Sequence, residues 1–205
     1  MSATLRDVAS ALVLEGISQQ DRKAVVAALS RYSLPLLERT AAAGCRIRKL
    51  AKRERYCDAS SSLRRLGVDV DAWPVPPAGL FVVEERTVYL RSCSLMTVGH
   101  EVGHAIDCAL GDGAYRSGYD PQIRAAFAAA PSFVTPYAAS GLDEYMAEGL
   151  RAYAGGLNDP RSPWPEATPQ RLRACDPALS HSSPSSLRRR AEPETPTGVA
   201  QSCCA

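Results

Sequence analysis

The sequence has few histidines and no long apolar run. Only three of its 205 residues are histidine, and no 18 consecutive residues are apolar. We therefore expect no transmembrane helix. The first residues lack a basic start followed by an apolar core, so the sequence predicts no signal peptide. This indicates a cytoplasmic protein, with export by a route that needs no signal peptide as the alternative.

The cysteines do not form a regular framework. There are seven, an odd number, which favours reduced thiols over a set of disulfides. C-x-x-C spacing, typical of thiolate metal sites, does not occur among Cys45, Cys57, Cys93, Cys108 and Cys175. Cys203 and Cys204 are interpreted as part of a terminal tail, with acylation or a bridge between two chains as alternatives.

The charge gives no sign of a polyanionic partner. The formal net charge is +2, which is close to neutral for this length. Six of the ten residues in 46–55 are basic, a pattern compatible with contact to nucleic acid or an acidic substrate. Aromatic residues are not interleaved with them, and no nucleic-acid-binding motif is present. We therefore interpret the run as a solvated face and expect no nucleic-acid partner.

Composition predicts one folded unit followed by a tail. Hydrophobic residues make up 45% of the chain, enough for a proper core. We expect a single domain over residues 1–175. Residues 176–205 are rich in serine, proline and arginine and are expected to be disordered, because they contain too few apolar residues to fold alone.

Apolar periodicity and capping residues predict an α+β fold, rich in helix with a small sheet. We expect helices over 3–15, 22–43 (capped by Asp21 and kinked or broken at Pro35), 60–66, 95–110, 121–129 and 142–154. A strand is expected at 46–50, and a hairpin is predicted from 80–83 and 87–90.

The pattern H-E-x-x-H at residues 100–104 lies within the predicted helix over 95–110. Residues four apart share one helical face, so His100 and His104 can bind a single metal ion. Glu101 lies about 100° around the helix, where its carboxylate can take a proton from a water molecule at the metal. Two histidines and one further ligand are typical of catalytic zinc, which keeps a fourth position open. The alternative is a pair of helical histidines with structural partners.

The sequence argues against two sources of the third ligand. The metzincin pattern requires glycine and histidine three and six residues after His104, where this chain has Asp107 and Leu110. His181, the third histidine, lies in Ser/Pro-rich sequence that rarely holds a rigid ligand.

A better source is the predicted helix over 142–154. Glu144 and Glu148 are four apart on one face of it. One carboxylate can bind zinc while the other holds the free N–H of a ligand histidine. The alternative is a solvated acidic face on which Glu148 pairs with Arg151 without consequence.

The chain resembles the catalytic domain of the anthrax lethal factor family, which includes secreted Pro-Pro endopeptidases. The resemblance covers about residues 79–155 and is strongest at 100–107 (HEVGHAID), at 135–137 (TPY) and at 144–148 (EYMAE). The chain lacks the large substrate-recognition domains of the toxin. The resemblance implies a zincin-like fold of the gluzincin type, with one Zn²⁺ per chain.

It also implies roles for individual residues. Glu144 matches the third zinc ligand, and Tyr137, seven residues earlier, matches a tyrosine that supports the transition state. Glu148 matches the family's glutamate next to the ligands, and Asp107 is expected beside them as well. A phenol can donate a hydrogen bond to a developing oxyanion, which agrees with the role that the resemblance implies for Tyr137. A half-buried loop tyrosine is the alternative for Tyr137.

The sequence thus predicts a zinc metalloendopeptidase that binds a peptide or protein in extended form along the hairpin strand. Some relatives cut beside proline, which the residues of this chain do not show. The alternatives are a non-catalytic zinc-binding regulatory module and a toxin-like effector protease.

Overall fold

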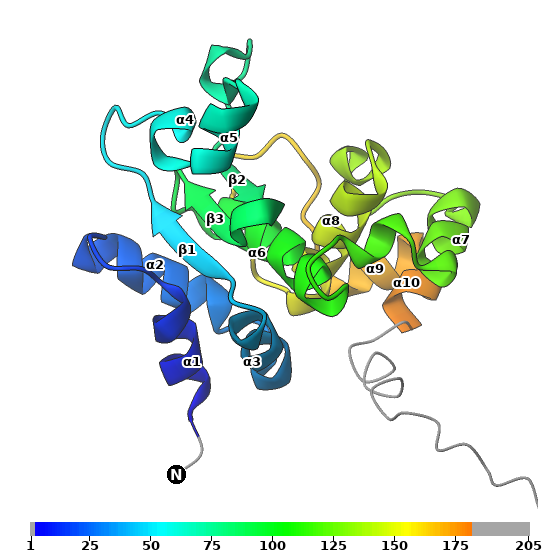
Figure 1. Cartoon of the computed structure of the whole chain (residues 1–205). Coiled ribbons are helices and arrows are strands. Elements are labelled where there is room, and N and C mark those ends of the chain that lie inside the picture. The colour runs from blue at the N-terminus through cyan, green and yellow to red at the C-terminus, as the bar shows by residue number, and fades with distance from the viewer. Residues whose placement is uncertain (1–2, 182–205) are drawn as a thin grey trace, which may run out of the picture.

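The computed structural model describes residues 3–181 and has a helix-rich α+β fold around a small sheet (Figure 1), as predicted. The strands are β1 (Arg46–Lys49), β2 (Gly79–Val82) and β3 (Thr87–Leu90). The helices are α1 (Leu5–Leu12), α2 (Gln19–Leu29), α3 (Leu34–Ala42), α4 (Tyr56–Ala59), α5 (Ser61–Leu66), α6 (Leu95–Leu110), α7 (Pro121–Ala129), α8 (Leu142–Ala154), α9 (Pro169–Cys175) and α10 (Pro177–His181). Four 3₁₀ turns are η1 (Val70–Ala72), η2 (Val83–Glu85), η3 (Arg116–Gly118) and η4 (Pro136–Ala139).

The sheet has the order β1-β3-β2, so β2 is an edge strand. β2 and β3 form the predicted hairpin and pair antiparallel, with Leu80 opposite Tyr89. β1 runs parallel to β3, with Ile47 opposite Val88. An edge strand presents unpaired backbone groups on its outer side.

The two faces of the sheet support separate apolar clusters. Phe81 and Val88 belong to the main core, which also contains buried residues of α6 and α8. Val82 and Tyr89 belong to a second cluster with residues of α4 and α5. This division follows from the alternation of side chains along a strand. Since the main core lies between the sheet and α6, it fixes that helix beneath β2 and β3 (Figure 1).

The single helix predicted over 22–43 is two helices, α2 and α3. Ser33 precedes α3 and Pro35 lies in its first turn. Proline has no N–H to donate and is tolerated in a first turn, where the amide needs no partner within the helix. The prediction of a break was right, but the break falls before Pro35.

The other helices differ from expectation mainly at their ends. Ser18, not Asp21, caps α2: its side chain accepts a hydrogen bond from the Asp21 amide. The helix predicted over 3–15 is shorter, because Thr4 caps it and Val13 leaves it in extended conformation. The helices over 95–110, 121–129 and 142–154 are present as predicted. The strand over 46–50 ends one residue earlier, and the helix over 60–66 begins after its cap, Ser60.

The folded part extends past residue 175, where the tail was expected to begin. Asp176 is buried and accepts a hydrogen bond from the hydroxyl of Tyr145 in α8. Leu179 of α10 packs against the main core. The first residues of the predicted tail are therefore structured, because their few apolar and acidic side chains find partners on α8. The rest of that prediction, with Cys203 and Cys204, lies outside the described residues.

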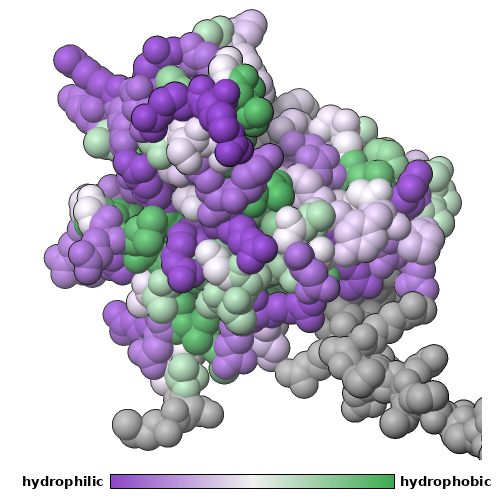
Figure 2. All heavy atoms as spheres, viewed as in Figure 1, coloured by the Kyte–Doolittle hydropathy of each residue, from purple (hydrophilic) through white to green (hydrophobic). Residues whose placement is uncertain are grey.

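Polar residues cover most of the face seen in Figure 2, and its apolar residues form small separate groups. Within residues 3–181, no helix is both long and apolar enough to cross a membrane. The five cysteines of this part, from Cys45 to Cys175, are free thiols.

Candidate metal centre

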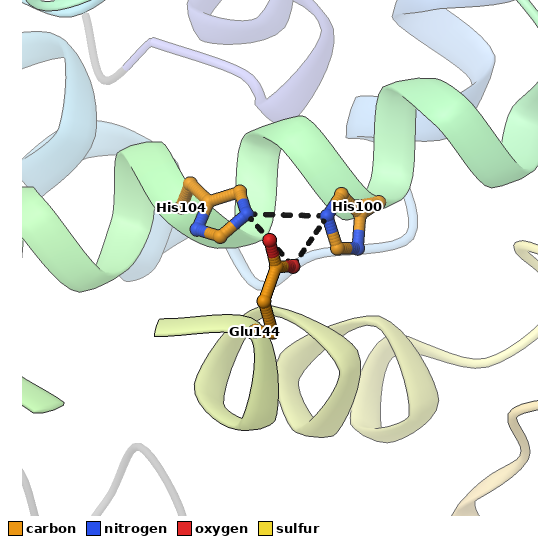
Figure 3. Close-up of side chains that lie close together, drawn as sticks. All are labelled: His100, His104 and Glu144. Carbon is orange, nitrogen blue, oxygen red and sulfur yellow. Dashed lines mark hydrogen bonds and ion pairs between the residues drawn. The ribbon is translucent and has the colours of Figure 1, made fainter. Parts of the chain in front are cut away.

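Two helices bring three potential ligands to one point (Figure 3). His100 and His104 project from α6 toward Glu144 on α8. The two histidine Nε2 atoms are 3.1 Å apart. Glu144 Oε2 is 3.0 Å from His100 Nε2 and 3.3 Å from His104 Nε2. The three atoms thus form a nearly equilateral triangle.

Local sequence explains why these helices carry the group. Ser94 caps α6 by accepting the Thr97 amide, and most residues of the helix are buried. α8 has no side-chain cap at Gly141, but Asp143 and Glu144 lie in its first turn. Negative charge there is favourable, because the helix dipole is positive at this end.

A glycine permits the close approach of the two helices. A Cβ atom at Gly103 would lie 2.8 Å from the backbone of Ala147, closer than real Cβ contacts. Gly103 lies beside His104, and Ala147 lies beside Glu148. The absence of a side chain at Gly103 therefore sets the spacing at which Glu144 can meet the histidines.

Gly103→Val is expected to lower the free energy of unfolding by about 1–3 kcal/mol, because the side chain would overpack a rigid helix contact. The midpoint of urea unfolding measures this effect. Gly118→Val is the matched control: a Cβ there meets nothing within 4 Å. We expect it to stay within about 0.5 kcal/mol of the parent. Equal effects of the two substitutions would contradict the close-packing argument.

The triangle has the dimensions of a zinc site. Tetrahedral zinc with bonds of about 2.0–2.2 Å separates neighbouring ligand atoms by roughly 3.3–3.6 Å, slightly more than the distances in the triangle. Glu144 Oε2 and His104 Nδ1 are buried and have no hydrogen-bond partner among the described residues. Buried polar atoms in proteins seldom lack a hydrogen-bond partner. A cation between the three atoms would satisfy the carboxylate oxygen.

The electrostatics of the group also favour a cation. Burial works against a charged imidazole, yet the adjacent carboxylates of Glu144 and Glu148 raise the pKa of His100 to about 10. Burial also opposes ionisation of Glu144, but the two histidines beside its carboxylate hold its pKa well below the usual range. A field that keeps a proton on a buried histidine attracts any positive charge placed there.

Glu148 lies behind the triangle. Its Oε1 is 2.9 Å from His100 Nδ1, the ring nitrogen that faces away from Glu144. Arg151 donates to the same carboxylate through Nε at 2.8 Å and Nη2 at 2.7 Å. Burial opposes its charge, but the hydrogen bonds from His100 and Arg151 lower the pKa of Glu148 to about 2. The Glu148–Arg151 pair is buried, so it is not a solvated surface pair.

Glu101 faces the sheet. It is 7% exposed, and its Cγ would lie 2.5 Å from a Cβ at Gly79 of β2. The nearby backbone of Phe81 favours the charged form of its carboxylate. Burial raises the pKa of Glu101, against the pull of the two histidines. A carboxylate with a raised pKa beside an edge strand is suited to accept and return a proton.

Tyr137 projects from η4 at the open side of the group. Its side chain is 45% exposed, and its hydroxyl donates to Glu144 Oε1 at 2.9 Å. The ring centroid is 5.4 Å from that of His100. Burial and the Glu144 carboxylate raise the pKa of the phenol, so it keeps its proton.

Asp107 is fully buried, and its hydrogen bonds go to another loop. It accepts from the Ser117 amide at 3.1 Å and from Ser117 Oγ at 2.5 Å. Burial raises its pKa to about 6, against these hydrogen bonds. No hydrogen bond joins Asp107 to either histidine among the described residues, so it anchors η3 to α6. The side chain of His181 lies outside the described part.

Two residues of the site were not predicted. Arg151 was weighed only as a surface partner of Glu148, and Thr135, whose hydroxyl lies 2.6 Å from Glu148 Oε2, was not considered as a contact. The spacing of three between Glu148 and Arg151 was the available signal. Sequence does not show that this pair is buried.

The arrangement of the chain has a known counterpart. The structure of the Pro-Pro endopeptidase from Paenibacillus alvei superimposes with a TM-score of 0.59 and 17% sequence identity, covering 85% of this chain and 96% of that one. This likeness concerns the fold alone and confirms the predicted helix-rich α+β architecture. No family model and no curated protein sequence matches the chain.

Proposed function

We propose that this chain is a zinc-dependent endopeptidase. The observation that supports this most is the triangle of His100 Nε2, His104 Nε2 and Glu144 Oε2, with the Glu101 carboxylate on the same helix. When bound there, zinc would make water a nucleophile at neutral pH and polarise the carbonyl of a peptide bond. Glu148 would hold the His100 ring through Nδ1.

Proton transfer, stabilisation of the oxyanion and substrate binding fall to residues of the chain. Glu101 takes the proton from the attacking water and returns it to the leaving amine. Tyr137 donates a hydrogen bond to the carbonyl oxygen as it becomes negative. The substrate lies extended beside β2, whose outer edge pairs with no strand of the sheet, and gains main-chain hydrogen bonds there.

Zinc binding is the first test. Glu144→Ala is expected to abolish stoichiometric zinc binding, because it removes one of three ligands. Glu148→Gln should weaken zinc by about 10- to 100-fold, the usual cost of a lost partner behind a ligand. Competition with a chelator measures the zinc affinity of both variants. Asp143→Ala, in the same helical turn, is the control and should keep zinc. Full occupancy in Glu144→Ala would exclude that ligand.

Peptide hydrolysis is the second test. The purified, zinc-loaded chain is incubated with a peptide library, and cut sites are mapped by mass spectrometry. We expect cleavage that a chelator stops and added zinc restores. A chain that binds one zinc but cuts no peptide would favour the non-catalytic zinc-binding module instead.

A further inference from the structure

Four hydrogen bonds meet at the buried carboxylate of Glu148. One oxygen faces His100 Nδ1 and Arg151 Nε, at 2.9 and 2.8 Å. The other accepts from Thr135 Oγ1 and Arg151 Nη2, at 2.6 and 2.7 Å. Arg151 also donates to the backbone oxygen of Leu157, so its guanidinium is fixed on two sides. The carboxylate is therefore held in one orientation by charge and geometry.

Thr135 joins this carboxylate to the turn that carries Tyr137. Its hydroxyl gives its proton to Glu148 and accepts the Ala138 amide at 3.3 Å, which caps η4. Thr135 is fully buried, whereas the Tyr137 side chain is 45% exposed. Besides its contacts with Glu144 and His100, the half-exposed ring depends on the backbone of the turn for its position.

We propose that Thr135 is a positioning residue, which fastens the Tyr137 turn to the same carboxylate that orients His100. This inference rests on the proposed function. Through Glu148, the ring of a metal ligand and the donor to the developing oxyanion are held at a fixed distance. Arg151 balances the charge of Glu148, so the carboxylate that contacts both Thr135 and His100 can be buried.

Steady-state kinetics of the zinc-loaded chain test this role. Thr135→Val removes the hydroxyl but keeps the volume, and it is expected to lower kcat by about 10- to 100-fold, since small misplacements of catalytic groups carry such costs. KM should change by less than about twofold, because the affected bond forms in the transition state. Thr135→Ser should restore most of the rate. Unchanged kcat in Thr135→Val would overturn the proposal.

Thr168 provides a matched control. Its hydroxyl caps α9 by accepting the Arg171 amide, away from Glu148. Thr168→Val loses the same kind of cap and should keep the kcat of the parent. An equal loss in both variants would mean that a missing cap, not the link to Glu148, lowers the rate. If Thr135→Val does not fold, Thr135→Ala removes the same hydroxyl without adding bulk.

A double-mutant cycle separates positioning from general destabilisation. If Thr135 acts through the hydroxyl of Tyr137, then Thr135→Val should change kcat by less than about threefold in a Tyr137→Phe background. A residue that supports the fold alone would lower the rate equally in both backgrounds. Additive effects would therefore overturn the proposal.

Amide hydrogen exchange provides a readout that does not need activity. In the zinc-loaded chain, the segment 135–140 should exchange faster in Thr135→Val and at the parent rate in Thr135→Ser. Equal exchange rates in the parent, Thr135→Val and Thr135→Ser would show that Thr135 does not fasten the turn. A parent chain that cuts no peptide would overturn the proposed function, and exchange would still decide whether the turn is held.

Discussion

Glu101→Gln is expected to abolish peptide hydrolysis and to leave zinc bound. Glutamine has the size of glutamate and fits the tight contact with Gly79, but it cannot accept the proton of the attacking water. General base catalysis contributes about 10²- to 10⁴-fold, so kcat should fall by that factor. Glu101 does not belong to the triangle of ligand atoms, and zinc content should therefore match the parent. Metal analysis and peptide cleavage on the same sample measure both quantities.

The control for this variant is Glu84→Gln, which changes an exposed carboxylate between β2 and β3 and should keep full activity. Loss of zinc in Glu101→Gln would mean that the carboxylate supports the fold of the site. Cleavage at the parent rate would remove Glu101 from the mechanism.

Tyr137→Phe should lower kcat by about 10²- to 10³-fold, the usual cost of one lost oxyanion donor. Zinc content and KM should stay close to the parent values, because the bond to the carbonyl oxygen is complete only in the transition state. In the free chain the hydroxyl donates to Glu144, and a substrate would compete for this donor. Cleavage kinetics under zinc saturation measure the effect.

Tyr153→Phe is a suitable comparison, because Tyr153 lies on α8 and is similarly exposed, at 41%. We expect it to leave kcat unchanged. If Tyr137→Phe is within about twofold of the parent, Tyr137 is a loop residue and the oxyanion needs another donor.

Local sequence was sufficient for the parts of the site that lie within one helix. The spacing of four places His100 and His104 on one face wherever α6 packs, and the structure shows both rings there. Spacing alone could not decide between Glu144 and Glu148, because both lie on one face of α8. The approach of α6 to α8 at Gly103 places Glu144 at the Nε2 atoms and Glu148 at Nδ1.

Contacts between distant segments were beyond prediction. Thr135 reaches Glu148 only because η4 folds back onto α8. Arg151 lies three residues after Glu148 on that helix, but its burial depends on the loop after α8, where Leu157 accepts a hydrogen bond from it. Composition also gave no sign of α10, where the buried Asp176 accepts a hydrogen bond from Tyr145 and Leu179 packs against the main core. Such contacts depend on a few side chains and leave no periodic pattern.

The docking of α10 limits how the metal site can be transplanted into another protein. A graft of residues 79–155 would carry α6, η4 and α8. It would leave the hydroxyl of Tyr145 without Asp176, and it would uncover Gly149, where the side chain of Leu179 fills the space that a Cβ would need. Both positions flank Glu148. A portable version of the site must therefore include the chain through α10.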